Sequence, residues 1–261
     1  MIIPFNKYQG TGNDFVIIDN RRRIFNPKDN ALVSRLCDRR FGIGADGLIL
    51  ISDSCGLDFE MRYFNSDGNE STMCGNGGRC SAAFAYKNGI AGSEQRFLTA
   101  DGIHKAQVTE EVVRLRMNEV TGIKTMGENL FINTGSPHFV TFTEQLAKLD
   151  VVAKGREIRW SETFSPGGTN VNFVELLPDG IFVRTFERGV EDETLSCGTG
   201  VTASAIASVF SGHFDTGKIN VSTKGGKLTV EFSIEGDSAK EIWLTGPATF
   251  VFGGNIDIPV S

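Results

Sequence analysis

The sequence predicts an α+β protein that contains two copies of one unit. Short runs rich in Val, Ile and Phe dominate, and many are bounded by Gly, Asn or Asp, which is typical of β-strands, whereas helical stretches are fewer. An Arg-x-Phe segment followed by a polar stretch and Cys-Gly-x-Gly occurs twice, once from Arg62 to Cys74 and once from Arg184 to Cys197. This repeat divides the 261-residue chain somewhere near 115–130.

The elements follow in chain order from these patterns. We expect strands at Phe15 to Asp19, Leu48 to Ser52, Phe59 to Phe64, Val112 to Met117, Phe139 to Phe142, Asn172 to Leu177, Phe182 to Phe186 and Lys227 to Phe232. The Pro178-Asp179-Gly180 turn predicts a hairpin, because Pro presets one backbone angle and Gly accepts a positive one. We expect a helix over Pro27 to Arg39, and two Ala-rich helices after the cysteine motifs that end at Asn88-Gly89 and at Gly212.

Composition excludes several classes of protein. The net charge is −6 and no long run of Lys or Arg occurs, which argues against a nucleic-acid or anionic membrane surface. No stretch of 18 apolar residues and no signal-peptide pattern is present, so we expect neither a membrane span nor export. Five cysteines without a CxxC pair favour reduced thiols in a cytoplasm and give no support for a zinc site.

Each repeat places a cysteine at the start of an Ala-rich helix. The helix dipole and the N–H groups of the first turn favour the thiolate, so we expect the pKa of each thiol to fall below its ordinary value of about 8.5. The same N–H groups suit a carboxylate. Two such helix ends facing each other would hold one small anion between two thiols. One thiolate would take a proton from carbon and the opposite thiol would deliver one to the other face, which inverts a stereocentre.

Other interpretations of these residues remain open from the pattern alone. A non-catalytic module that binds amino acids or a peptide would use the same helix ends without chemistry, and a thiol peroxidase or disulfide-exchange protein would use two low-pKa thiols. We expect Cys37, Cys55 and Cys80 to be small buried apolar residues. His104 and His213 have no motif around them, and we expect both at the surface.

The chain resembles the diaminopimelate epimerase family nearly from end to end. The segments that carry the resemblance are Gly12-Asn13-Asp14-Phe15-Val16, Arg40-Phe41-Gly42-Ile43-Gly44-Ala45-Asp46, Phe64-Asn65-Ser66-Asp67-Gly68, Cys74-Gly75-Asn76-Gly77-Gly78-Arg79-Cys80, Gly135-Ser136-Pro137-His138, Gly168-Thr169-Asn170-Val171-Asn172-Phe173, Glu187-Arg188-Gly189, Cys197-Gly198-Thr199-Gly200 and Gly246-Pro247-Ala248. They occur in the order typical of the family. The resemblance implies a cofactor-independent epimerase that interconverts LL- and meso-diaminopimelate in lysine and peptidoglycan precursor synthesis.

The resemblance also implies roles for individual residues. Cys74 and Cys197 would be the paired catalytic bases, with Cys197 deprotonating the LL isomer and Cys74 returning the proton. Glu187 would face the far ammonium of the substrate and lie close to the thiols, and His138 would tune the pKa of a cysteine. The remaining substrate-binding set is Asn13, Asn65, Gly75, Asn76, Asn170, Arg188, Gly198 and Thr199. Neither a metal nor an organic cofactor is implied.

The implied fold is two pseudo-symmetric α+β halves, each a mostly antiparallel sheet curled around a central helix. The expected halves are residues 1–118 and 119–248, with a final strand from about 249 to 261 returning to the first half. By analogy we expect a homodimer that binds a small-molecule substrate in the cytoplasm. Oxidation that joined Cys74 to Cys197 would make activity depend on reductant.

Two departures from the family pattern concern substrate binding. Many relatives carry Gln where this sequence has Gly47, and many carry Asn where it has Ser136. Proline and hydroxyproline racemases are the alternative within the same fold, but they carry His where Asn76 stands, and proline has no second charged end for Glu187 and Arg188. A phenazine-pathway isomerase is disfavoured because it lacks the cysteine pair.

Overall fold

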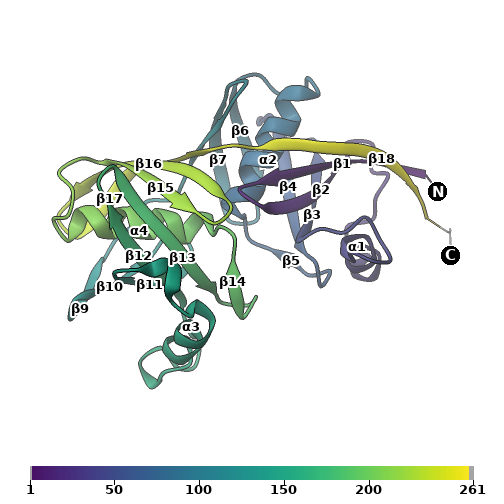
Figure 1. Cartoon of the computed structure of the whole chain (residues 1–261). Helices are drawn as coiled ribbons and strands as arrows, with labels where there is room; N and C mark the ends of the chain where they lie inside the picture. The colour runs from purple at the N-terminus through teal and green to yellow at the C-terminus, as the bar shows by residue number, and fades with distance from the viewer. Residues whose placement is uncertain (1, 259–261) are drawn as a thin grey trace. The chain divides into compact units, whose positions relative to one another are not determined.

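The computed structural model describes residues 2–258 and divides into two compact units. Unit 1 contains residues 2–115 and 246–258, and unit 2 contains residues 116–245. Each unit combines a mixed, mostly antiparallel sheet with α-helices (Figure 1). The predicted α+β fold is confirmed. Residues 259–261 of the expected final strand lie outside the described residues.

Unit 1 surrounds one helix with a sheet that begins and ends far apart in the sequence. Its elements are β1 (Ile2–Gly10), β2 (Asn13–Asp19), α1 (Asn30–Cys37), β3 (Gly47–Ser52), β4 (Phe59–Asn65), β5 (Glu70–Ser71), α2 (Gly75–Lys87), β6 (Glu94–Thr99), β7 (Gly102–Val108), β8 (Val113–Arg116) and β18 (Thr249–Asp257). The strand order is β18-β1-β2-β3-β4-β6-β7-β8, with β5 added beside β4. The β2–β3 and β4–β6 pairs are parallel and the others are antiparallel.

Unit 2 repeats this plan. Its elements are β9 (Lys124–Met126), β10 (Asn129–Asn133), β11 (Pro137–Phe142), the 3-10 turn η1 (Leu146–Lys148), α3 (Val151–Arg159), the 3-10 turn η2 (Glu162–Phe164), β12 (Asn170–Leu177), β13 (Gly180–Glu187), β14 (Asp192–Thr194), α4 (Gly198–Phe210), β15 (Lys218–Thr223), β16 (Gly226–Glu235) and β17 (Ser238–Gly246). The order β10-β11-β12-β13-β15-β16-β17 has parallel pairs at β11–β12 and β13–β15.

The two units therefore match element by element. α1 connects the parallel pair β2–β3, and α3 connects the corresponding pair β11–β12. α2 follows β4 and β5, just as α4 follows β13 and β14. The sequence repeat that begins at Arg62 and at Arg184 thus corresponds to one structural unit, a strand followed by a polar loop and a buried helix.

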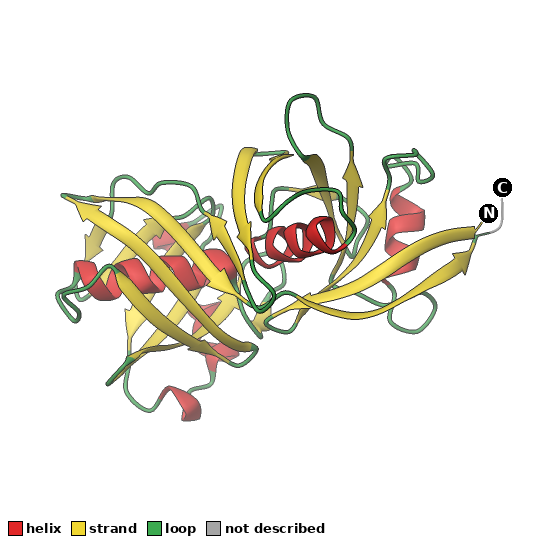
Figure 2. Cartoon of the chain, turned by 90° about the horizontal axis from the view of Figure 1, so that it is seen from above, coloured by secondary structure: helices red, strands yellow, loops and turns green. Residues whose placement is uncertain are grey.

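Each central helix packs against many strands of its own sheet. α2 contacts β1, β2, β3, β4, β7 and β18, and α4 contacts β10, β11, β12, β13, β15 and β16. Figure 2 shows these helices (red) surrounded by strands (yellow). Small side chains allow such close approach, and hydroxyl groups within the helices bond to preceding carbonyls, as Ser81 does to Gly77 O and Ser204 to Gly200 O. The polar groups of these small residues are thereby satisfied away from water.

The expected helix over Pro27 to Arg39 is shorter in the structure, because it begins at Asn30 after the cap Asp29, whose carboxylate accepts from Leu32 N. Two expectations about exposure were wrong. Cys55 is exposed rather than buried, because it lies in the turn between β3 and β4. His104 is buried, because it points inward from β7 beside the Phe97 ring, whereas His213 is exposed as expected.

Candidate functional site

Cys74 occupies the N-terminal end of α2 in unit 1. It is the cap residue, with an extended backbone (φ −92°, ψ 129°), and the helix begins at Gly75. Gly78 N donates the first helical hydrogen bond to Cys74 O at 2.7 Å. Helix geometry therefore directs the N–H groups of Gly75, Asn76 and Gly77 out of the helix end, on the side of the thiol. This arrangement suits an anion.

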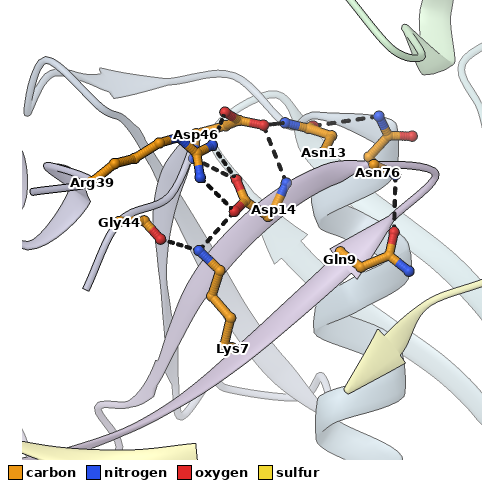
Figure 3. A network of polar contacts seen from close by, with 9 residues as sticks. Lys7, Gln9, Asn13, Asp14, Arg39, Gly44, Asp46 and Asn76 are labelled. Carbon is orange, nitrogen blue, oxygen red and sulfur yellow. Dashed lines mark hydrogen bonds and ion pairs between the residues drawn. The ribbon is translucent and has the colours of Figure 1, made fainter. Parts of the chain in front are cut away.

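The Cys74 thiol lies against the side chain of Asn13. Its Sγ donates to Asn13 Oδ1 across 3.6 Å, and Asn76 Nδ2 donates to the same oxygen at 3.3 Å. Figure 3 shows the Asn13 and Asn76 amides meeting at this point. Asn76 is almost completely buried. The structure thus brings three of the expected residues, Asn13, Gly75 and Asn76, together at Cys74.

The amide nitrogen of Asn13 contacts a cluster of charged side chains, which are Lys7, Asp14, Arg39 and Asp46. Asn13 Nδ2 donates to Asp46 Oδ2 at 2.6 Å, and Arg39 bridges Asp46 to Asp14 with contacts of 2.7–2.9 Å. Lys7 completes the cluster with an ion pair to Asp14 of 2.8 Å and a hydrogen bond to Gly44 O (Figure 3). The Arg39 and Lys7 cations hold the pKa of the Asp14 carboxyl well below its usual range, although burial opposes this shift.

Arg79 lies on the other side of Asn76 and is completely buried. Its guanidinium donates to Asn76 Oδ1 at 2.9 Å, to Gly75 O at 3.3 Å, and to Thr11 Oγ1 and Pro247 O at 3.4 Å each. Burial lowers its pKa from the ordinary value. Sequence reasoning gave no role to this arginine or to Asp46. The one sequence signal for a buried Arg79 is its position among the Gly, Ala and Cys residues of a helix.

Asn65 is the last residue of β4 in unit 1. It pairs across the sheet with Gly47 of β3. A Cβ on Gly47 would lie 2.5 Å from Cε2 of Tyr63 and 2.6 Å from Phe64 O, so no side chain fits there without a shift. The Tyr63 ring and the Phe64 backbone thus favour glycine at position 47.

Cys197 occupies the corresponding position in unit 2. It caps α4 with an extended backbone (φ −110°, ψ 112°), and the helix begins at Gly198. Its Sγ lies 3.4 Å from Thr199 Oγ1, and the residue is 8% exposed. Thr134 Oγ1 donates to Thr199 O at 3.0 Å and so fixes the first turn of the helix. A hydroxyl can rotate to donate to a thiolate, which an amide oxygen cannot do.

His138 is buried beneath the first turn of α4. Its Nδ1 lies 3.0 Å from Asn172 Nδ2, so Nδ1 accepts and the proton is on Nε2, an atom with no hydrogen-bond partner within residues 2–258. Burial, together with the nearby Arg188 cation, lowers the pKa of His138 to about 3, although the hydrogen bond with Asn172 opposes the shift. The imidazole is therefore neutral at physiological pH. Gly200 permits this packing, since a Cβ there would lie 3.3 Å from His138 Cε1.

Asn170 fixes the backbone at the end of β13. Its Nδ2 donates to Ser136 Oγ at 2.6 Å and to Pro137 O at 2.9 Å, while its Oδ1 accepts from Arg188 N at 2.8 Å. Ser136 thereby takes part in positioning Arg188. Glu187 precedes Arg188 at the end of the strand and is half-buried, whereas Arg188 is exposed.

Five of the expected residues lie beside a cysteine at the start of a central helix. Asn13, Gly75 and Asn76 lie at Cys74, and Gly198 and Thr199 lie at Cys197. His138, Asn170, Glu187 and Arg188 lie in unit 2, on β11, β12 and the end of β13. Within the described part of the chain, no three His, Cys, Asp or Glu side chains are grouped as metal ligands. None of the helices in residues 2–258 is long and apolar enough to cross a membrane.

Comparisons with known proteins agree with this picture. The family model described as diaminopimelate epimerase matches residues 5–123 and 130–251. A diaminopimelate epimerase of Flavobacterium psychrophilum is 50% identical over 248 residues, which cover 94% of this chain and 97% of that protein. The enzyme of the same name from Aquifex aeolicus is 44% identical, with 97% and 98% covered.

Solved structures share the fold at much lower sequence identity. A Bacillus anthracis phenazine biosynthesis protein of the PhzF family superposes with a TM-score of 0.80 at 16% identity, covering 99% of this chain and 100% of that chain. A hydroxyproline epimerase from Agrobacterium vitis superposes with a TM-score of 0.70 at 14% identity, covering 98% and 92%. These two similarities concern the fold alone.

Proposed function

The chain belongs to the diaminopimelate epimerase family, and we propose that it interconverts LL- and meso-2,6-diaminopimelate without a cofactor. The identity with relatives of that name, 44–50% over nearly the whole chain, carries this assignment. The cysteine at the N-terminal end of the central helix in each unit is consistent with it. The product serves lysine and peptidoglycan precursor synthesis. The activity is that of an isomerase.

The proposed chemistry is a two-base proton transfer. The Cys197 thiolate takes the α-proton of the LL isomer, and the electron pair of the broken C–H bond is left on carbon. Cys74 then gives its S–H proton to the opposite face of that carbon, so Cys197 ends as thiol and Cys74 as thiolate. N–H groups at the two helix ends stabilise the negative charge that develops on the substrate carboxylate. No electron is gained or lost overall.

The roles of the other residues are part of the proposal. Backbone N–H groups of Gly75, Asn76, Gly198 and Thr199 would bind the carboxylate at the reacting carbon. Asn13, Asn65, Asn170 and Arg188 would bind the far amino-acid end of the substrate, with Glu187 facing its ammonium. An exposed guanidinium suits a carboxylate because it donates two parallel hydrogen bonds. His138 would act as a neutral group that shapes the environment of a cysteine.

Proton exchange in deuterium oxide, followed by NMR under reducing conditions, tests the assignment. LL-diaminopimelate is compared with L-proline and L-hydroxyproline, using the wild type and the Cys74→Ser and Cys197→Ser variants. We expect deuterium to enter only diaminopimelate, with conversion to the meso isomer that each variant loses. Exchange into proline or hydroxyproline instead would place the chain with the racemases, and exchange into none of them would favour a binding module.

Three further proposals concern the domain organisation, the cellular location and the oligomeric state. We propose that unit 1 and unit 2 correspond to the N-terminal and C-terminal epimerase halves, that the protein works in the cytoplasm, and that it forms a homodimer. Light scattering coupled to size-exclusion chromatography measures the molar mass in solution. A mass near that of one 28.4 kDa chain would contradict the dimer.

A further inference from the structure

Two side-chain amides in unit 1 form a chain between a buried cation and a carboxylate. Arg79 donates to Asn76 Oδ1 at 2.9 Å, Asn76 Nδ2 donates to Asn13 Oδ1 at 3.3 Å, and Asn13 Nδ2 donates to Asp46 Oδ2 at 2.6 Å. Figure 3 shows the part of this chain from Asn76 to Asp46. The chain passes directly beside Cys74, whose sulfur contacts Asn13 Oδ1.

The two charged ends determine which way both amides point. A guanidinium only donates hydrogen bonds, so Asn76 must turn its oxygen toward Arg79 and its nitrogen toward Asn13. An ionised carboxylate only accepts, so Asn13 must turn its nitrogen toward Asp46 and its oxygen away. Both requirements give the same orientation of Asn13. The assignment of its oxygen and nitrogen atoms therefore follows from the charges at the two ends.

The orientation has a chemical consequence at the thiol. Asn13 presents an oxygen to Cys74, and this oxygen accepts from S–H but cannot donate to a thiolate. At Cys197 the neighbouring group is the Thr199 hydroxyl, which can donate to a thiolate. The amide chain thus favours the protonated form at Cys74, whereas the hydroxyl permits the thiolate at Cys197.

We propose that Asp46 and Arg79 are positioning residues that hold the Asn13 and Asn76 amides in one orientation, so that Cys74 waits as the proton donor. The assignment rests on the proposed two-base function, because the donor role has meaning only in that reaction. Arg39 supports Asp46 from behind, at 2.7 Å from its Oδ1. Neither Asp46 nor Arg79 needs to touch substrate.

Other charges near Cys74 also affect the balance between its thiol and thiolate forms. The Arg79 cation and the helix end favour the thiolate, while Asp101, which accepts from Met73 N at 3.3 Å, disfavours it. Cys80 follows Arg79 on α2, and burial raises its pKa to about 12, so it stays neutral. Lys7 and Arg39 balance the charges of Asp14 and Asp46. A test must therefore separate the amide orientation from simple charge.

The test measures the pKa of Cys74 from the pH dependence of its alkylation by iodoacetamide, read by peptide mass spectrometry. The background carries Cys197→Ser and the exposed Cys55→Ser, so that Cys74 is the reactive thiol; burial raises the pKa of Cys37 and Cys80 to about 12. In Asp46→Asn the Asn13 amide loses the group that can only accept a hydrogen bond. The contact from Asn76 then holds its orientation alone, so the Asn13 N–H group can turn toward sulfur more readily. We expect the Cys74 pKa to fall by about one unit, which is the size of one hydrogen bond.

Asp14→Asn is the matched control. It removes one negative charge from the same cluster but leaves the contact between Asp46 and Asn13 intact. We expect its effect on the Cys74 pKa to be less than half that of Asp46→Asn. Equal shifts in the two variants, or an unchanged or higher pKa in Asp46→Asn, would overturn the proposal.

A second measurement does not depend on a variant that folds. In wild-type protein with ¹⁵N-labelled asparagine, the Asn13 side-chain NH₂ should show a stronger NOE to the Asp14 amide proton than to the Cys74 β-protons. The reverse intensity would overturn the proposal. The alkylation readout is independent of turnover, so loss of the proposed epimerase activity and loss of this inference are distinguishable.

Discussion

Alanine at Gly200 and alanine at Gly77 should have very different effects, although the two glycines occupy equivalent positions, three residues after Cys197 and Cys74. A Cβ on Gly200 would lie 2.3 Å from Asn172 Oδ1 and 3.3 Å from both Thr185 Oγ1 and His138 Cε1. Those atoms belong to one buried network, in which Thr185 donates to Asn172 and Asn172 contacts His138. The new methyl group must therefore displace a hydrogen-bonded amide.

The magnitudes follow from these contacts. Overpacking costs about 1–3 kcal/mol, and disrupting a buried hydrogen bond costs about 1–3 kcal/mol more. Replacing Gly by Ala in a helix returns at most about 1 kcal/mol. From the middle of each range, Gly200→Ala should destabilise the protein by about 3 kcal/mol, which corresponds to a Tm lower by roughly 6–12 °C.

Gly77 has a different environment. A Cβ there would meet only the ends of flexible apolar side chains, Ile49 Cδ1 at 3.3 Å, Met61 Cε at 3.4 Å and Phe15 Cε1 at 3.5 Å. We expect Gly77→Ala to change stability by less than about 1 kcal/mol, because the gain in helix propensity offsets the tighter packing. Thermal unfolding followed by circular dichroism compares the variants. Equal losses of Tm, or a larger loss at Gly77, would refute the reasoning.

Three further perturbations have expected outcomes. The folded-state pKa of His138, about 3, lies below the unfolded value of about 6.5, so the unfolded state binds the extra proton and stability falls as the pH drops below 6.5. Urea titrations should therefore give a free energy of unfolding that is about 2 kcal/mol lower at pH 5 than at pH 7. The His138→Gln variant should lack that difference. Gly47→Ala should cost about 1–3 kcal/mol by the same measurement, since its Cβ would meet Tyr63 and a backbone oxygen, and an unchanged stability would contradict the packing described for β3. If mass spectrometry of an oxidised sample shows a Cys74–Cys197 disulfide, activity should be lost and reductant should restore it; full activity in that sample would exclude the two-thiol mechanism.

The eight strands predicted from apolar runs bounded by turn residues all occur in the structure, but β1, β6, β7, β10, β15 and β17 were missed. β3 and β4, for example, begin or end within one residue of the predicted limits. α3 was missed although Asp150 caps it and accepts from Ala153 N at 3.0 Å. Gly155 in its middle suggests a helix breaker, but a Cβ there would lie 2.3 Å from Phe186 Cβ, so close packing on β13 requires glycine. The internal repeat could have predicted α3, because α1 occupies the corresponding position in unit 1.

The helix ends could likewise be predicted from local chemistry. Gly89 and Gly212 take positive φ values of 65° and 76° just beyond α2 and α4, as glycine after a helix should. Residues that act through contacts distant in sequence could not be found this way. Asp46 and Arg79 lie 33 and 66 residues from Asn13, and only the folded sheet brings them to one amide chain. Local patterns contain no information about such a pairing.

The pairing of β1 with β18 has a consequence for synthesis on the ribosome. β1 is made just before β2 and pairs with it soon afterwards, but its other edge is completed by Thr249–Asp257, more than 230 residues later in the chain. At translation rates of about 5–20 residues per second, that edge stays open for tens of seconds. Unpaired strand edges attract other chains. A nascent chain therefore exposes the free edge of β1 until β18 has been made, and during this interval chaperone binding would prevent pairing with other chains.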